Sequence, residues 1–464
     1  MCNVSLNGTQ PTDASIRVLR ALEAAGLEAW YVGGWVRDAL MGRPSHDVDM
    51  CCSGLWQESK AALEAADIAV VESGIKFGGI TAICDGERIE VTTYRLDGFY
   101  TDGRHPQSVE RAASLEDDLA RRDFTVNAMA WHPERGLVDR YDGQGDLDRK
   151  LIRAVGDPKR RFNEDALRML RAVRFACRLD FMIEPATKQA LAECAPLLDA
   201  VARERVGIEL EGILSTGHGG DAMLRYPELV CAAVPELAPA RGFDQRSVYH
   251  AFNVYEHIAR VLTVAGELAL CDGVAPSSSL MWAAFLHDVS KPDCFTVDHA
   301  GSGHFYGHPE LGATKARVIM DRLALSHDLV RDVCLLIKYH DKPLRPERSC
   351  LLNMMRALSG EGVDTPRLMD ELMDLKRADT LGKAPSCFYY VETIEEMRAL
   401  THELLAAGEP YTLKMLAING GDLIRAGVKP GPELGQLLNA ALDAVIEDNV
   451  PNECEALLAH LHLG

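Results

Sequence analysis

Residues 28–52, EAWYVGGWVRDALMGRPSHDVDMCC, contain the pattern that decides the fold of the N-terminal part of the chain. EAWYV has the length and apolar content of a short buried strand, WVRDALMG has helical spacing, and HDVDMCC is strand-like again. Gly33 and Gly34 separate the first strand from the helix. The stretch therefore predicts a strand that turns at two glycines into a helix, followed by a second strand.

The neighbouring segments extend this domain and then change character. Residues 14–25 have helical spacing, and 68–73, 78–84 and 88–95 are strand-like in length and β-branched content. From about residue 151 the strand signals nearly vanish, and apolar positions recur at spacings of three and four. We therefore predict an α+β fold, in which an N-terminal sheet domain is followed by a mainly helical remainder.

The composition narrows the class of protein. A chain of 464 residues exceeds what one hydrophobic core supports, so several domains are expected. No apolar run is long enough to cross a bilayer, and the polar N-terminus lacks a secretory pattern. The thirteen cysteines are scattered, which favours reduced thiols. We expect a cytoplasmic protein with no membrane association, and no protein partner is evident.

The charge distribution limits contact with nucleic acid to one place. A net charge of -20 argues against indiscriminate binding, because phosphate affinity comes largely from Lys and Arg. Residues 149–178, however, hold ten Lys or Arg against three acids. We therefore expect a local nucleic-acid or nucleotide site there.

Asp47 and Asp49 are the first candidate catalytic residues. Side chains two apart on a strand share a face, so both carboxylates can reach one pair of metal ions, and oxygen ligands suit Mg²⁺. Glu90 lies in mid-strand between two apolar neighbours and can complete the site. The alternatives are a surface turn for the aspartates and a solvated position on an edge strand for Glu90.

Two further segments carry groups that can hold phosphate. At Gly33 and Gly34, unhindered backbone N–H groups at the start of a helix can bind phosphate oxygens, although a plain strand–helix turn has the same pattern. Residues 121–127, RRDFTVN, join two guanidiniums that can hold phosphate or ribose to an Asp and an Asn one helical turn apart. The alternative here is a capped helix with Asp123 as its N-cap. The candidates in this second segment are Arg121, Arg122, Asp123 and Asn127.

Residues 164–178 are predicted to form one helix, with Ala166, Leu170, Val173 and Cys177 on an apolar stripe. Arginines at 168, 171, 174 and 178 flank that stripe. Asp165 and Arg168 are close around this helix, so they offer an acceptor and a donor that can read the edge of a nucleotide base. The alternative is a solvated basic face with an ion pair between these two residues.

Five motifs, taken in order, resemble those of the class II tRNA nucleotidyltransferase (CCA-adding enzyme) and bacterial poly(A) polymerase family. They are GGWVRD (33–38), HDVDM (46–50), IEVTTYR (89–95), RRDFTVNAMA (121–130) and EDALRMLRAVRFA (164–176). ERVGIELEGIL (204–214) and LAINGGDLIRAGVKPGPELGQLL (416–438) extend the resemblance almost to the C-terminus. It implies a polymerase-beta-like nucleotidyltransferase head (1–150), a helical neck that binds the base and RNA (151–240), an HD domain (241–385) and a helical tRNA-binding tail (386–464).

The same resemblance implies roles for the candidate residues. Asp47, Asp49 and Glu90 hold Mg²⁺, and Gly34 and Arg37 bind the nucleotide. Arg121, Arg122 and Asp123 contact phosphates and ribose. Asp165 and Arg168 pair with the base of CTP or ATP, assisted by Arg171 and Arg174. Residues 95–117 resemble a mobile loop in which Arg104 can act.

A second site is indicated by another resemblance. His287 and Asp288 in FLHDVSKP, with His257 upstream and Asp379 downstream, resemble the ligand set of the HD phosphohydrolase superfamily, which implies a second divalent metal. Imidazole and carboxylate can share such an ion. The stretch 303–312, GHFYGHPELG, and His340 add histidines that also occur in such domains.

The leading hypothesis is transfer of CMP and AMP from CTP and ATP to the 3′ end of tRNA, with release of pyrophosphate. The nearest alternative is poly(A) polymerase, but a polymerase of many RNAs would benefit from a basic tail, and the segment after about residue 430 is acidic. Enzymes that add only CC or only A share these motifs. A different class of function is a metal-dependent HD phosphohydrolase whose N-terminal domain merely binds nucleotide.

Overall fold

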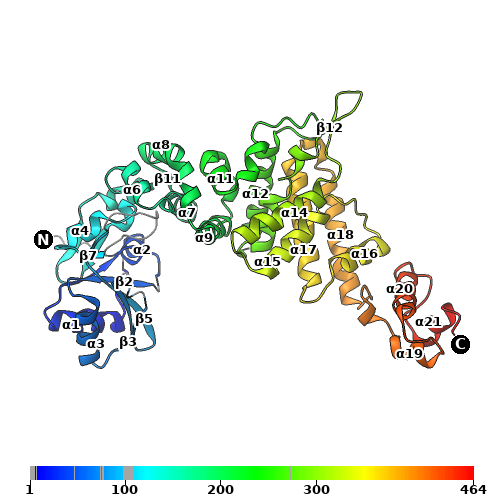
Figure 1. Cartoon of the computed structure of the whole chain (residues 1–464), viewed down its shortest axis with the longest axis horizontal. Coiled ribbons are helices and arrows are strands. Elements are labelled where there is room, and N and C mark those ends of the chain that lie inside the picture. Colours follow the sequence, from blue (N-terminus) through cyan, green and yellow to red (C-terminus); the bar gives the residue numbers. More distant parts are fainter. Residues whose placement is uncertain are drawn as a thin grey trace. The chain divides into compact units, whose positions relative to one another are not determined.

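The computed structural model describes residues 6, 8–45, 47–73, 75, 78–97, 109–271 and 273–463. Arg104, a candidate in the predicted loop, lies outside these residues. The chain divides into two compact units (Figure 1). Unit 1 comprises Met1–Leu210 and Tyr226–Ala233, and unit 2 comprises Glu211–Arg225 and Val234–Gly464. The finer four-part division at residues 150, 240 and 385 stays a prediction.

Unit 1 contains a seven-stranded mixed sheet of order β3-β4-β5-β2-β1-β8-β9. Within it β2 and β5 run parallel, and the other neighbouring strands are antiparallel. The predicted α+β class with a mixed N-terminal sheet is thus confirmed. The hairpin of β8 and β9 was not predicted, although β8 is buried throughout and pairs with β1.

The two faces of the sheet have different partners, and this difference positions the candidate site. Val48 and Met50 of β2 point into a core that also includes α1 and α3 side chains. Cys51, on the opposite face, packs with Leu115 and Leu119 of helix α4. Because side chains alternate along a strand, Asp49 lies on the same face as Cys51. The end of α4 is therefore brought towards the predicted carboxylates.

The helix predicted over residues 164–178 is interrupted, which corrects the expectation of one continuous element. Helix α6 ends at Glu164, and α7 begins at Arg168. Asp165 between them has an extended backbone, with φ -147° and ψ 106°, and its side chain accepts a hydrogen bond from the Leu167 N–H. An aspartate that bonds to the backbone two residues on favours such a turn over helix. The predicted apolar stripe is nevertheless buried at Ala166, Leu170 and Val173.

The elements of unit 1 follow in chain order (Figure 1). They are α1 Asp13–Ala24, β1 Ala29–Val32, α2 Gly34–Leu40, β2 Val48–Cys52, α3 Trp56–Ala65, β3 Ala69–Val71, β4 Gly79–Cys84, β5 Glu87–Thr93, β6 Arg95–Asp97, β7 Val109–Arg111, α4 Leu115–Ala120, β8 Met129–His132, β9 Gly136–Asp139, α5 Gly143–Asp148, β10 Leu151–Ile152, α6 Pro158–Glu164, α7 Arg168–Leu179, β11 Met182–Ile183, α8 Pro185–Cys194, α9 Arg203–Leu214 (which continues into unit 2) and α11 Pro227–Ala233.

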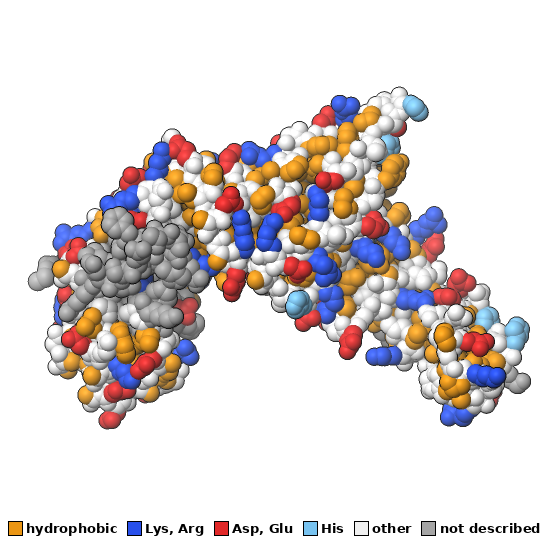
Figure 2. All heavy atoms as spheres, in the orientation of Figure 1, with side chains coloured by type: hydrophobic (Ala, Val, Ile, Leu, Met, Phe, Trp, Pro, Cys, Tyr) orange, Lys and Arg blue, Asp and Glu red, His pale blue; other side chains and the backbone are white. Residues whose placement is uncertain are grey.

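The described residues of unit 2 form helices and one pair of two-residue strands, in agreement with the predicted helical remainder. On the face shown in Figure 2, its basic and acidic side chains are interspersed. Its elements are α10 Gly219–Arg225, α12 Val254–Cys271, α13 Ser278–Leu286, β12 Thr296–Val297, β13 Gly303–His304, α14 His308–Arg322, α15 His327–Tyr339, α16 Arg348–Leu358, α17 Thr365–Gly382, α18 Tyr390–Ala406, α19 Gly420–Arg425, α20 Pro432–Ile446 and α21 Cys454–His460.

Two observations bear on the expectations from composition. Among the residues that the structure describes, no helix is both long enough and apolar enough to span a membrane. Every described cysteine is a free thiol.

Candidate functional site

The three predicted carboxylates of unit 1 come together at the β2–β5 pair. Asp49 and Glu90 occupy paired positions of the two parallel strands, and Asp47 directly precedes β2. The pKa of Asp49 is raised to about 6, mainly by burial and also by the charges of Glu90 and Asp47, against the opposing charge of Arg122. The negative charge at this place exceeds what nearby side chains neutralise. A set of carboxylate oxygens with uncompensated charge fits a Mg²⁺ ion.

Gly33 lies against this carboxylate site. Its φ of 69° and ψ of -132° are nearly restricted to glycine. A Cβ at position 33 would lie 3.0 Å from Arg122 Nη1 and 3.7 Å from Asp49 Oδ2. The Gly33 N–H donates to the Met129 carbonyl oxygen at 3.4 Å. The predicted free N–H donor is therefore not found at Gly33, whose contribution is to leave room for Arg122 and Asp49.

Replacing Gly33 by alanine is expected to raise KM for the nucleotide that the sequence predicts at this site, because the new Cβ crowds Arg122 Nη1 and shifts that guanidinium. It should also destabilise unit 1 by about 1–3 kcal/mol through backbone strain. Steady-state kinetics and urea unfolding measure the two effects. The matched control is Gly26→Ala, which has a φ of +79° and no atom within 4 Å of the added Cβ. It should lower stability without changing KM, and an unchanged KM for Gly33→Ala would contradict the assignment.

Asp118 anchors the two arginines that follow α4, and sequence reasoning missed it. Its Oδ1 accepts from Arg121 Nε at 2.9 Å and its Oδ2 from Arg122 Nη2 at 3.1 Å, and the carboxylate is fully buried. Burial alone would raise the pKa of Asp118, but the charges of Arg122 and Arg121 outweigh it and hold that pKa below its usual value. The spacing of three and four residues was the available signal, since such pairs meet on a helix.

Asp123 and Asn127 connect helix α7 to helix α2. Asp123 Oδ2 pairs with Arg171 Nη2 at 2.7 Å, and its Oδ1 accepts from Asn127 Nδ2 at 3.2 Å. Asn127 Oδ1 in turn accepts from Arg37 Nη1 at 2.7 Å. Arg37 is buried, and its guanidinium lies 5.4 Å from the Phe175 ring centre. The alternative of Asp123 as an N-cap is wrong, because a short 3₁₀ helix at Thr125–Asn127 follows with no side-chain cap.

Asp165 and Arg168 both lie at the break between α6 and α7, but each is held by other groups. Arg168 donates to Glu164 Oε2 and to the Arg121 carbonyl oxygen, both at 3.0 Å. Asp165 Oδ2 accepts from Arg205 Nη2 at 3.2 Å. The alternative of an Asp165–Arg168 ion pair is therefore wrong. Sequence reasoning missed Arg205, which lies in the ERVGIELEGIL motif and fixes the orientation of the Asp165 carboxylate.

Acidic side chains from within the basic segment 149–178 and from outside it pair with most of its basic residues. Eight of its ten basic residues form ion pairs, among them Arg174 with Glu209 of α9 at 2.7 Å. The segment is thus no open basic patch. Two of its arginines contact the loop 121–127: Arg171 pairs with Asp123, and Arg168 donates to the Arg121 carbonyl oxygen. The eight are Arg149, Arg153, Lys159, Arg160, Arg161, Arg168, Arg171 and Arg174.

The four predicted ligands of the second site converge in the interior of unit 2. His257 Nε2 lies 3.3 Å from Asp288 Oδ2 and 3.1 Å from Asp379 Oδ1. His287 Nε2 lies 3.2 Å from Asp288 Oδ2 and 3.4 Å from His257 Nε2. All four residues are buried. Two imidazoles and two carboxylates in this arrangement fit a divalent transition metal.

Comparison with known families covers most of the chain. A model described as the poly A polymerase head domain matches residues 29–153, and one described as the probable RNA and SrmB-binding site of polymerase A matches 180–240. An HD domain model matches residues 254–383, and a putative tRNA nucleotidyltransferase domain 2 matches 386–461.

Individual relatives match over nearly the full length. The CCA-adding enzyme of Pediococcus pentosaceus is 33% identical over 451 residues, which are 95% of each chain. The crystal structure of the Bacillus stearothermophilus CCA-adding enzyme in complex with CTP has a TM-score of 0.71 at 27% identity, over 98% of each chain. The Thermotoga maritima CCA-adding enzyme complexed with tRNA shares the fold, with a TM-score of 0.60 at 22% identity over 99% of each chain.

Proposed function

This chain belongs to the CCA-adding enzyme family, and on that premise we propose that Asp47, Asp49 and Glu90 of unit 1 are the catalytic carboxylates of its nucleotidyltransferase. The reaction adds CMP and AMP from CTP and ATP to the 3′ end of tRNA and releases pyrophosphate. The observation that carries the assignment is the β2–β5 register, which places Asp49 beside Glu90 on the face that α4 covers.

The residues around the carboxylates have complementary tasks. Bound Mg²⁺ supplies charge neutralisation and activates the attacking 3′-hydroxyl. Asp47, Asp49 and Glu90 present the oxygens that hold it. Arg122, which contacts the edge of this site and is fixed by Asp118, faces the triphosphate charge. Since its ion pair holds it in place before substrate arrives, little ordering is needed at the moment of transfer.

Asp165 and Arg168 read the base in this proposal, and their environment supports it. Asp165 is held by Arg205 and by the Leu167 N–H, and Arg168 by Glu164, so each side chain has a fixed direction. A pre-oriented acceptor and donor can select a base by its hydrogen-bonding edge. Arg171 and Arg174 lie 5.5 and 5.2 Å from the Phe175 ring centre and pair with Asp123 and Glu209, which holds α7 in position.

Asp165→Asn is expected to relax nucleotide selectivity, because an amide adds a donor where the carboxylate only accepts. One such contact contributes about 1–3 kcal/mol to discrimination, so the preference for CTP and ATP over UTP and GTP should fall about 10- to 100-fold. Competition assays with pairs of nucleotides measure it. Asp157→Asn is the control, since Asp157 caps α6 and asparagine caps equally well. Unchanged nucleotide selectivity in Asp165→Asn would mean that Asp165 does not take part in base recognition.

The function itself is tested by extension of a tRNA transcript that ends before CCA. With CTP alone the product should grow by C-C, and with CTP and ATP by C-C-A, with no growth in ATP alone. Long adenylate tails would instead indicate a poly(A) polymerase. Growth that stops after C-C in the presence of ATP, or that requires an existing C-C end, would indicate the CC-only or A-only enzymes.

A second function is supported by the buried cluster in unit 2. His257 Nε2 lies 3.3 Å from Asp288 and 3.1 Å from Asp379, His287 Nε2 lies 3.2 Å from Asp288, and Asp379 lines a cavity of about 580 Å³. This arrangement favours a second divalent metal, in unit 2, separate from the Mg²⁺ proposed in unit 1. It also favours a metal-dependent phosphohydrolase activity. Hydrolysis of p-nitrophenyl phosphate in the presence of Mn²⁺, Co²⁺ or Ni²⁺ tests it, and no turnover with any of these ions would contradict it.

A further inference from the structure

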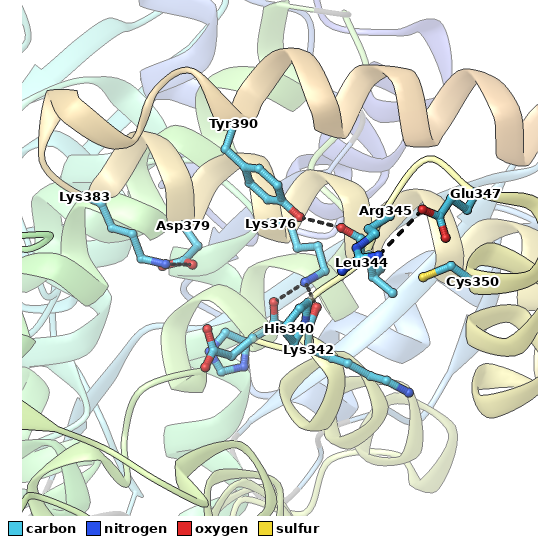
Figure 3. A pocket seen from close by; sticks show the side chains of 12 residues that line it. His340, Lys342, Leu344, Arg345, Glu347, Cys350, Lys376, Asp379, Lys383 and Tyr390 are labelled. Atoms are coloured by element: carbon cyan, nitrogen blue, oxygen red, sulfur yellow. Dashed lines mark hydrogen bonds and ion pairs between the residues drawn. The ribbon is translucent and has the colours of Figure 1, made fainter.

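The cavity of about 580 Å³ in unit 2 has a lining that is mostly distinct from the proposed metal site. It is formed by the loop 340–347, which joins α15 to α16, and by residues of α16, α17 and α18 (Figure 3). Its volume is in the range of sites for small organic molecules. Of the four proposed metal ligands in this unit, only Asp379 lines it. The chemistry of the cavity is therefore set by other side chains.

Lys376 of α17 brings a buried positive charge to this cavity. The residue is only 5% exposed, and its Nζ donates to the carbonyl oxygens of His340 and Lys342, at 2.7 Å each (Figure 3). An ammonium has three N–H donors, and no carboxylate of the described residues forms an ion pair with this one. Burial lowers the pKa of the Lys376 ammonium to about 8, because the charges of Asp341 and Asp379 compensate only in part. One donor and an unbalanced charge are left for a ligand.

Two further cations of the lining are exposed and loosely held. Arg345 pairs with Glu347 only at 3.8 Å, and its side chain is 77% exposed, so that pair contributes little. Lys342 is exposed as well, and its Nζ lies 5.7 Å from the ring centre of Tyr339. Both side chains are long and can turn towards an anion in the cavity. Lys376 would then hold the anion from the buried side.

The charge of the whole lining also favours an anion. Four basic and three acidic side chains line the cavity. Lys383 and Asp379 are paired at 2.6 Å and neutralise each other. The acid without an ion pair, Asp341, is exposed, where water weakens its field. The positive charges of Lys342 and Lys376 therefore dominate.

The other side of the cavity offers apolar surface for an organic group. Leu344 and Tyr390 line it, and the Tyr390 hydroxyl donates to the Leu344 carbonyl oxygen at 3.1 Å, which fixes the ring (Figure 3). A fixed tyrosine ring provides a flat contact surface, and its hydroxyl oxygen can still accept a hydrogen bond. An inorganic anion alone would fill only a small part of the cavity. The lining therefore fits an anionic group attached to an organic body.

We propose that this cavity binds a small organic phosphate monoester, with its phosphate group at Lys376 and its organic body against Leu344 and Tyr390. Phosphate has several acceptor oxygens, so it can bind the buried ammonium together with Lys342 and Arg345. The inference does not rest on a metal in unit 2, because the groups that bind the phosphate are not among the proposed metal ligands. It is also separate from the nucleotide site of unit 1.

The test uses Cys350 of α16, a half-buried thiol that lines the same cavity, as a local probe. The full-length chain is treated with iodoacetamide in EDTA at constant ionic strength, and alkylation of each cysteine is followed by peptide mass spectrometry. Phenyl phosphate at several times its Kd should slow alkylation of Cys350 about fivefold by mass action. It should leave the exposed Cys454 unchanged. Phenol should not protect Cys350, and inorganic phosphate should protect it only at higher concentration.

Variants identify the groups that hold the phosphate. Lys376→Met keeps the length of the side chain without its charge, and it should weaken protection about tenfold or more. Lys342→Met and Lys338→Met are a matched pair, because both ammoniums lie against the Tyr339 ring, at 5.7 and 5.3 Å, but Lys342 lines the cavity and Lys338 does not. Lys342→Met should raise the phenyl phosphate concentration for half protection about threefold, and Lys338→Met should not change it.

Several results would overturn the proposal. They are no protection of Cys350 by phenyl phosphate, equal protection by phenol, and equal half-protection concentrations for Lys342→Met and Lys338→Met. Protection that appears only when Mn²⁺ replaces EDTA would place the phosphate on the metal and would also overturn it. Circular dichroism checks the fold of each variant. The two exposed lysine variants decide the question even if Lys376→Met fails to fold.

Discussion

Replacing Asp49 by alanine is expected to lower kcat/KM for CMP incorporation by about a thousandfold or more. Metal-bound charge stabilisation contributes several kcal/mol to such a transition state, and each 1.36 kcal/mol is a factor of ten. Asp49 lies at the centre of the carboxylate group, between Glu90 and Asp47, so its removal should disrupt Mg²⁺ binding most. Incorporation of labelled CMP into a tRNA transcript lacking CCA, over a range of Mg²⁺ concentrations, measures the effect.

The matched control for this prediction is Asp85→Ala. Asp85 lies in the turn between β4 and β5 and forms an exposed pair with Arg17, so its loss should leave kcat/KM within about twofold, as exposed pairs contribute little. Asp49→Asn keeps the shape but removes the charge, and it should behave like the alanine variant. A near-normal rate for both Asp49 variants would place the metal elsewhere.

Asp118→Ala is expected to destabilise unit 1 by about 3 kcal/mol, because it leaves two guanidiniums without their buried counter-charge. The side chains of Arg121 and Arg122 are 14% and 16% exposed. The expected loss in the free energy of unfolding is therefore at the lower end of the values for broken buried ion pairs. Urea unfolding followed by tryptophan fluorescence reports on this unit. Four of the five tryptophans, Trp30, Trp35, Trp56 and Trp131, lie in it.

Two comparisons make the Asp118 prediction specific. Glu116→Ala, in the first turn of the same helix, removes only an exposed pair with Arg140 and should change the free energy of unfolding by less than about 1 kcal/mol. Asp118→Asn keeps the shape and should be intermediate. Equal stability of Asp118→Ala and Glu116→Ala would mean that the buried pair does not hold α4 and its arginines in place.

Strands β1 to β5 of the central sheet and the position of its carboxylates were predictable because they follow from local rules. The alternation of side chains along a strand placed Asp47 and Asp49 together and turned Glu90 away from Ile89 and Val91. The apolar spacing after residue 151 predicted the helices. In both cases the pattern lies within a few residues of sequence, where periodicity is informative.

Some partners of the charged residues were not predictable in this way, because they come from distant parts of the chain. Arg205 is 40 residues from Asp165, and Arg171 is 48 residues from Asp123. The break between α6 and α7 was missed because the apolar stripe continues through it. At the break, the Leu167 backbone N–H donates to the Asp165 carboxylate, directly after the end of α6. Periodicity carries no information about such contacts.

If Asp47 and its neighbouring carboxylates catalyse CCA addition, the products of an Asp47 variant must differ from those of the wild type. The measurement is sequencing of the 3′ ends of a tRNA transcript that ends before CCA, after incubation with CTP, ATP and Mg²⁺. The wild type and Asp85→Ala should produce ends that read C-C-A, and Asp47→Ala should leave the transcript unextended. C-C-A ends made by Asp47→Ala at the rate of the wild type would contradict the account.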